Sequence, residues 1–97
     1  MTYGDDEIDG ALERIASDVA RRSEQPEFHG PRMTVLLDDL RAMESARRAG
    51  DSAAAARYAT DALPVLESYR PTNATSRAKA LIAEVVAGVL AEPAPPS

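Results

Sequence analysis

Hydrophobic residues recur with helical spacing in four blocks of the chain, and glycine, proline and short polar residues separate these blocks. In the first block, residues 5–23, Ile8, Leu12, Ile15 and Val19 fall on one face of an α-helix. Acidic residues stand at the start of this block and arginines at its end, an order that the helix dipole favours. No block alternates with the two-residue period of a β-strand, so we expect an all-α fold.

The second and third blocks, residues 32–49 and 51–69, predict a helical hairpin that turns at Gly50–Asp51. Gly50 can adopt the left-handed conformation that ends one helix, and the Asp51 carboxylate can cap the next. Alanines line the inner face of the third block before Pro64, and larger side chains line it afterwards. The hairpin should therefore be close near Gly50 and more open at its far end. Because proline lacks a backbone donor, we expect the third helix to be kinked at Pro64, or to break there and continue as a short collinear helix.

The fourth block, residues 76–91, is the most apolar, and Glu84 is the only polar side chain between Ala80 and Ala91. A helix with this pattern is either the centre of a bundle or the interface with another chain. We expect its large apolar side chains to extend into the interface of a symmetric homodimer. These side chains are Leu81, Ile82, Val85, Val86, Val89 and Leu90.

Together the four blocks predict a small four-helix bundle in which neighbouring helices are antiparallel. A chain of 97 residues has room for one hydrophobic core. We therefore expect a single helical domain over residues 1–91. The proline-rich residues 92–97 should form a disordered tail.

Composition narrows the class of protein. The chain has no cysteine, which excludes disulfides and thiolate metal sites, and its net charge of −5 argues against nucleic acid as a partner. Its first ten residues are acidic and lack the order of a signal peptide, and no apolar run is long enough to span a membrane. The abundance of alanine and arginine is typical of a GC-rich genome. We expect a cytoplasmic bacterial protein.

The segment GDSAAAARYATDAL, residues 50–63, resembles the turn and second helix of a tetratricopeptide repeat. The preceding helix departs from the repeat, with Asp39 and Ala46 at its aromatic positions and Met43 at its small one. No second copy is present, so the resemblance implies a helical hairpin rather than a repeat array. The residues that carry the resemblance are Gly50, Asp51, Ala55, Tyr58, Ala62 and Leu63.

The side chains that could react, titrate or bind a metal form no catalytic, cofactor-binding or metal-binding pattern in the sequence. The single histidine, His29, lies in a loop of prolines and glycine, which favours a solvated role. An all-helical enzyme built on arginines and carboxylates would leave no short signature, so this class stays open. We expect no cofactor.

The bundle pattern favours a small non-enzymatic protein that presents helical surface to a protein partner, as an interaction or accessory protein. Its partner groove should lie at the open end of the hairpin, near Tyr58, Leu66 and Tyr69. The alternative is a small DNA-binding transcriptional regulator that uses the corner of the hairpin. Its nucleic-acid contacts would be Arg47, Arg48 and Arg57.

Overall fold

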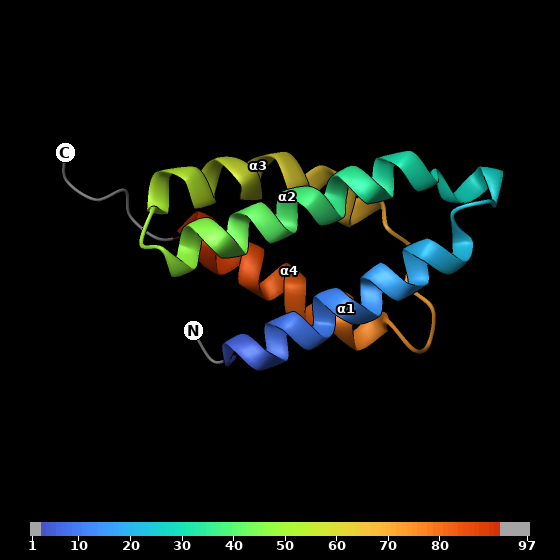
Figure 1. The fold of residues 1–97 in the computed structure, drawn as a ribbon, viewed down its shortest axis with the longest axis horizontal. Helices are drawn as coiled ribbons and strands as arrows, with labels where there is room; N and C mark the ends of the chain where they lie inside the picture. Colours follow the sequence, from blue (N-terminus) through green and yellow to red (C-terminus); the bar gives the residue numbers. More distant parts are fainter. Residues whose placement is uncertain (1–2, 92–97) are drawn as a thin grey trace.

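The computed structural model describes residues 3–91, which form helices and no strand (Figure 1). This confirms the predicted all-α fold of four α-helices. The predicted tail, residues 92–97, lies outside the described residues. The elements in chain order are α1 (Asp5–Arg22), a 3₁₀ turn η1 (Pro26–Phe28), α2 (Gly30–Arg48), α3 (Ser52–Ser68) and α4 (Ser76–Ala91).

Consecutive helices run in opposite directions, as Figure 1 shows. Helices α2 and α3 lie side by side and share the most extensive contact, while α4 packs against both α1 and α3. Because the bundle is antiparallel, the end of α1, the start of α2, the end of α3 and the start of α4 all lie at one end. We call it the Tyr69 end, and the opposite end, where α2 turns into α3, the Gly50 end.

The hairpin between α2 and α3 turns as the sequence predicts. Gly50 has a φ of 80°, a conformation that side chains other than glycine rarely adopt. The Asp51 carboxylate caps α3 by accepting a hydrogen bond of 3.1 Å from the backbone N–H of Ala54. Behind the turn, Ala55, Ala59 and Ala62 are at most 1% exposed, so small side chains bring the two helices together.

Pro64 lies inside α3 without ending it, since the helix continues to Ser68. The proline is exposed, and so is Thr60, whose carbonyl loses its usual backbone partner. A proline on the exposed side of a helix frees a carbonyl that water can satisfy, so it is tolerated there more easily than in a core. Pro64 is thus accommodated within one continuous helix rather than between two. A sharper departure from helical backbone lies at His29, which joins η1 to α2 with a φ of 55°.

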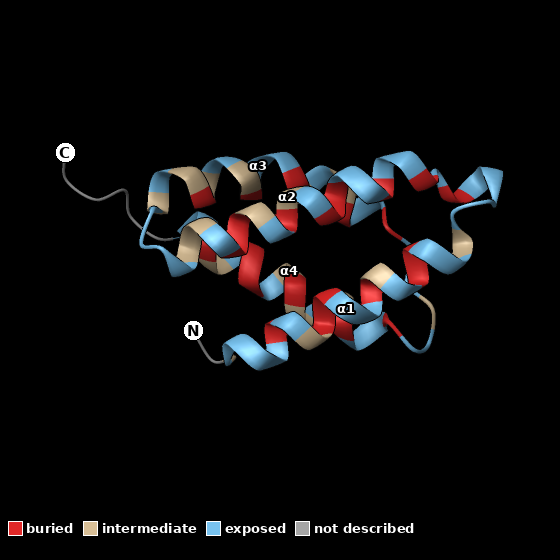
Figure 2. Ribbon diagram, viewed as in Figure 1, coloured by how far each residue is buried: buried red, intermediate tan, exposed pale blue. Residues whose placement is uncertain are grey.

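Helix α4 contributes its apolar side chains to the centre of the core, where Figure 2 shows buried positions facing inward from every helix. Four of the six residues expected at a dimer interface are at most 4% exposed within this single chain, namely Ile82, Val85, Val86 and Val89. Leu81 is half-buried and Leu90 is 38% exposed. The apolar pattern of α4 is therefore accounted for by the bundle's own core. A homodimer stays a prediction, with only Leu81 and Leu90 left from this set to form it.

Candidate functional site

A buried polar network joins the end of α1 to the end of α3 and the start of α4. Asp18 is 2% exposed and Tyr69 is 1% exposed. The Tyr69 hydroxyl donates a hydrogen bond of 2.6 Å to Asp18 Oδ2 and lies 3.1 Å from Thr75 Oγ1. Thr75 Oγ1 also accepts from the backbone N–H of Thr72 at 2.9 Å. Every buried side-chain nitrogen and oxygen in the described part of the chain has a partner, so this network is fully satisfied.

Two arginines complete the network around Asp18. Arg22 donates to Asp18 Oδ2 at 2.7 Å, and the more exposed Arg21 donates to Oδ1 at 2.6 Å. Burial by itself raises the pKa of Asp18, but the hydrogen bonds from Tyr69, Arg22 and Arg21 outweigh it and lower the pKa below its ordinary value. Burial and the bond to Asp18 raise the pKa of Tyr69 to about 12. Asp18 is therefore held charged and Tyr69 neutral.

Arg22 also ties the loop after α1 to the end of α3. Its guanidinium donates to the backbone oxygen of Arg70 at 2.8 Å and lies 4.1 Å from the centre of the Phe28 ring. That ring meets the Tyr69 ring edge to face, with ring centres 6.2 Å apart. Such aromatic and cation–π contacts add to the stability of the packed site. These contacts hold Arg22 and Phe28 in place, and we call these two side chains the floor of the Tyr69 end.

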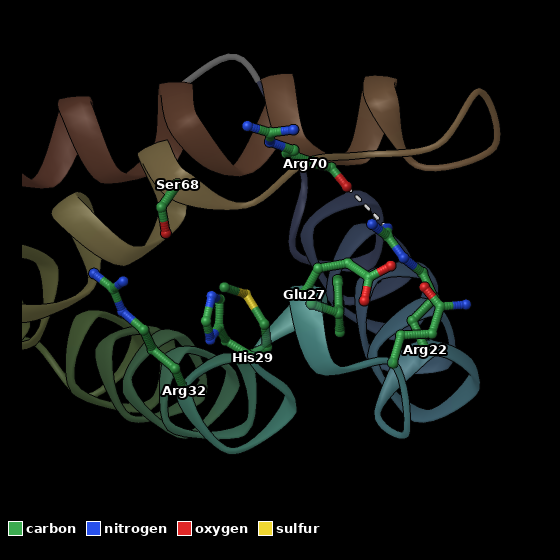
Figure 3. Close-up of a pocket in the computed structure, with 9 residues that line it drawn as sticks. Arg22, Glu27, His29, Arg32, Ser68 and Arg70 are labelled. Carbon is green, nitrogen blue, oxygen red and sulfur yellow. Dashed lines mark hydrogen bonds between the residues drawn. The ribbon is translucent and has the colours of Figure 1, made fainter.

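Above this floor lies a pocket of about 540 Å³, which we call the arginine pocket. In Figure 3, His29 and Arg32 lie on the α2 side of the hollow and Glu27 and Arg22 on the α1 side. Ser68 and Arg70 lie above them. Its lining residues are Arg22, Gln25, Glu27, Phe28, His29, Arg32, Met33, Ser68 and Arg70. A volume of this size is in the range of pockets that bind small ligands or several side chains of a partner.

The backbone at the start of α2 places Arg32 at the pocket. Gly30 is buried against the end of α1, where an added Cβ would lie 2.8 Å from the backbone oxygen of Ser23. Only glycine fits this close approach without a shift of the backbone. Pro31 then begins α2 with its φ already suited to a helix. The first turn of α2 is thus fixed next to α1, with Arg32 exposed at its edge.

The arginines of the pocket differ in their partners. Arg22 is paired with Asp18, whereas neither Arg32 nor Arg70 has a carboxylate within 4 Å in residues 3–91. Glu27 is the one carboxylate in the lining. After Asp18 and Glu27 are counted against the three guanidiniums, the pocket keeps a net positive charge.

The residues expected to form a partner groove lie elsewhere. Leu66 and Tyr69 are each 1% exposed and belong to the core, and Tyr58 is half-buried. The arginine pocket lies at the end of the hairpin where the groove was expected, but none of these three residues lines it. Tyr69 instead turns inward because it is the first residue after α3 and bonds to Asp18, which lies 51 residues earlier.

Sequence reasoning missed the arginine pocket because it joins two stretches that lie far apart in the sequence, residues 22–33 and 68–70. The sequence did contain a signal for it. An antiparallel bundle brings the end of each helix next to the start of the following one, so charges at those positions can be added together. Six of the eleven basic residues lie at the helix ends that meet at the Tyr69 end. These are Arg21, Arg22, Arg32, Arg70, Arg77 and Lys79.

The arginines expected to contact DNA are largely engaged within the protein. Arg47 pairs with Asp5 and Glu44, and Arg48 pairs with Asp5, Asp9 and Glu44, so two guanidiniums face three carboxylates. The hydrogen bonds that Arg47 donates to Glu44, the largest influence, and to Asp5 raise the pKa of Arg47. Arg57 joins no ion pair within residues 3–91, and its guanidinium lies 5.8 Å from the centre of the Tyr58 ring. The hairpin corner therefore offers little free positive charge.

Residues 3–91 contain neither a metal site nor a membrane span. No three or more histidine, aspartate or glutamate side chains in this part of the chain are placed to hold a metal ion together. None of its helices combines the length and the apolar character needed to cross a membrane.

Comparison of the chain with protein-family models, with curated proteins and with solved structures finds no match.

Proposed function

We propose that the protein is a small non-enzymatic interaction or accessory protein that binds a protein partner through the arginine pocket. The observation that carries the proposal is a net cationic pocket on a fixed floor, in a chain with a net charge of −5. Charges of opposite sign on two proteins steer their association and set its specificity. A cytoplasmic location in a bacterium is part of the same proposal.

The rest of the described surface supports this choice of site. Only two large hydrophobic side chains in residues 3–91 are exposed, Val35 at 55% and Leu90 at 38%. Large exposed apolar patches are the usual mark of an obligate interface, and scattered single residues are not. A partner should therefore bind by polar and charged contacts, and the pocket at the Tyr69 end offers Arg32 and Arg70, which have no carboxylate within 4 Å in residues 3–91.

A photo-crosslinking side chain at position 68 tests the proposal in cells of the native host. Ser68 lines the arginine pocket, and exposed Thr60 on the same helix does not, so position 60 is the matched control. We expect one discrete adduct from position 68 and none from position 60. The adduct should disappear when Arg32→Glu and Arg70→Glu are added.

Three results would contradict the proposal: the same adducts from both positions, no adduct from position 68, or an adduct that survives both charge reversals. A thermal melt of each variant shows whether the bundle is intact. Both arginines are exposed, so their replacement should leave the fold in place.

A further inference from the structure

The guanidinium groups of the arginine pocket are spread around it rather than aimed at one point. Arg22 comes from the end of α1, Arg32 from the start of α2 and Arg70 from the segment after α3. Figure 3 shows Arg32 and Arg22 on opposite sides of the hollow and Arg70 above it. A single phosphate binds best where several donors converge on one group, whereas separated guanidiniums suit separate single charges.

The remaining lining has the character of a peptide-binding surface. Phe28 and Met33, which are 6% and 3% exposed, contribute small apolar areas, and Gln25 and Ser68 contribute polar groups. The floor of the pocket is fixed, because Arg22 is held by Asp18, by the Arg70 carbonyl and by the Phe28 ring. A preformed site of this kind loses little conformational freedom when a partner binds.

We infer that the partner segment is an acidic peptide, with aspartate or glutamate side chains spaced so that Arg32 and Arg70 bind different carboxylates. This inference rests on the proposed function and names the chemistry of its partner. It follows from the net positive charge of the pocket and from the absence of a carboxylate within 4 Å of Arg32 or Arg70 in residues 3–91. Glu27 opposes such a partner, since it places a carboxylate in the same lining.

Three synthetic peptides with blocked termini test the inference by fluorescence anisotropy. The first has four glutamates around one leucine, the second has glutamine at those four positions, and the third has glutamine there and one phosphoserine. We expect the glutamate peptide to bind at least about tenfold more tightly than the other two. Its affinity should fall several-fold when salt rises from about 50 mM to about 300 mM, because exposed charges are screened.

Matched variants of the protein locate the binding. Arg32→Glu and Arg70→Glu should each weaken binding of the glutamate peptide about tenfold. Arg41→Glu is the control, since this exposed arginine lies on α2 about 13 Å beyond Arg32 and on the opposite side of the helix. It should change the affinity by less than about twofold. Glu27→Gln should strengthen binding, a gain that damage to the fold would not produce.

The inference is overturned if the glutamate and glutamine peptides bind alike or do not bind, if Arg41→Glu weakens binding as much as Arg32→Glu, or if the phosphoserine peptide alone binds. The cross-linking experiment separates this failure from that of the proposed function. In a lysate of the native host, an adduct at position 68 that excess glutamate peptide does not reduce would leave a partner at the pocket and remove the acidic segment. Loss of the adduct itself would remove both.

Discussion

Arginines at the two ends of the bundle meet opposite conditions. At the Gly50 end, Arg47 and Arg48 face three carboxylates, and their links to α1 go through Asp5 and Asp9, which are 58% and 54% exposed. At the Tyr69 end, the tie between α1 and α3 is the buried bond from Tyr69 to Asp18, while Arg32 and Arg70 meet no carboxylate within residues 3–91. Where a buried polar network holds the helices, the surface arginines are left available to a partner.

The two ends should also contribute differently to the free energy of unfolding. A charged group that is buried and bonded is costly to leave without its partner, whereas an exposed ion pair contributes little. Loss of the buried Asp18 at the Tyr69 end should therefore have a large effect, as should loss of Glu44, which is 3% exposed, whereas the exposed links from Arg48 to Asp5 and Asp9 should contribute little.

Replacement of Asp18 by alanine should have the largest effect. It leaves the buried Tyr69 hydroxyl without its acceptor and removes the carboxylate that pairs with Arg22. We expect the free energy of unfolding to fall by about 2–4 kcal/mol, measured by urea denaturation. Asp38→Ala, which removes an exposed carboxylate on α2, is the control and should cost less than about 0.5 kcal/mol. Equal losses in the two variants would refute the special role of the Tyr69 end.

Replacement of Tyr69 by phenylalanine should cost less, about 1–2 kcal/mol, because Asp18 keeps both of its arginines. Tyr58→Phe is the control, since the Tyr58 hydroxyl makes no hydrogen bond within residues 3–91 and its removal should be close to neutral. A Tyr69→Phe protein as stable as the wild type would mean that the buried bond contributes nothing net.

The two shifted pKa values give opposite pH dependences. The pKa of Tyr69 is raised from 10.0 to about 12, so its stabilisation is complete below pH 10 and is lost as the pH rises towards 12. The pKa of Asp18 is lowered from 3.8, so its stabilisation is present above that pH and is lost as the pH falls through the lower value. Urea denaturation across the pH range should show an alkaline loss that Tyr69→Phe removes and an acid loss that Asp18→Asn reduces. A wild type without the alkaline loss would contradict the Tyr69 assignment.

The smallest effect is expected at the Gly50 end. Arg48 is 34% exposed and pairs with Asp5 and Asp9, which are more than half exposed. It also pairs with the buried Glu44, which keeps Arg47 as a partner at 2.8 Å when Arg48 is replaced. Replacement of Arg48 by alanine should lower the stability by at most about 0.5 kcal/mol, and added salt should reduce even this difference. A loss above about 1.5 kcal/mol would show that the exposed ion pairs are as important as the buried network.

Local patterns in the sequence predict the helices and the hairpin because these features depend on neighbouring residues. The glycine and aspartate at positions 50 and 51 specify the turn by their own backbone and capping chemistry. The dense apolar side chains of the last helix indicate that it is buried. They do not indicate whether it is buried by its own chain or by a second one. Ile82 and Val86 are fully buried by the chain itself.

The candidate site could not be predicted in the same way. The bond between Asp18 and Tyr69 joins residues 51 positions apart, and no local pattern links them. The arginine pocket combines single arginines from three helix ends, which come together only when the antiparallel order is known. Summing the charges at each end of a predicted bundle would have pointed to the Tyr69 end.

Amide chemical shifts of the labelled protein, recorded by NMR as the glutamate peptide is added, test the central claim most directly. The account predicts that the shifted amides cluster in residues 22–33 and 68–70, around the arginine pocket. Amides around Gly50, where the arginines already have carboxylate partners, should stay in place. Shifts centred on residues 44–51, or spread evenly along the chain, would contradict the claim.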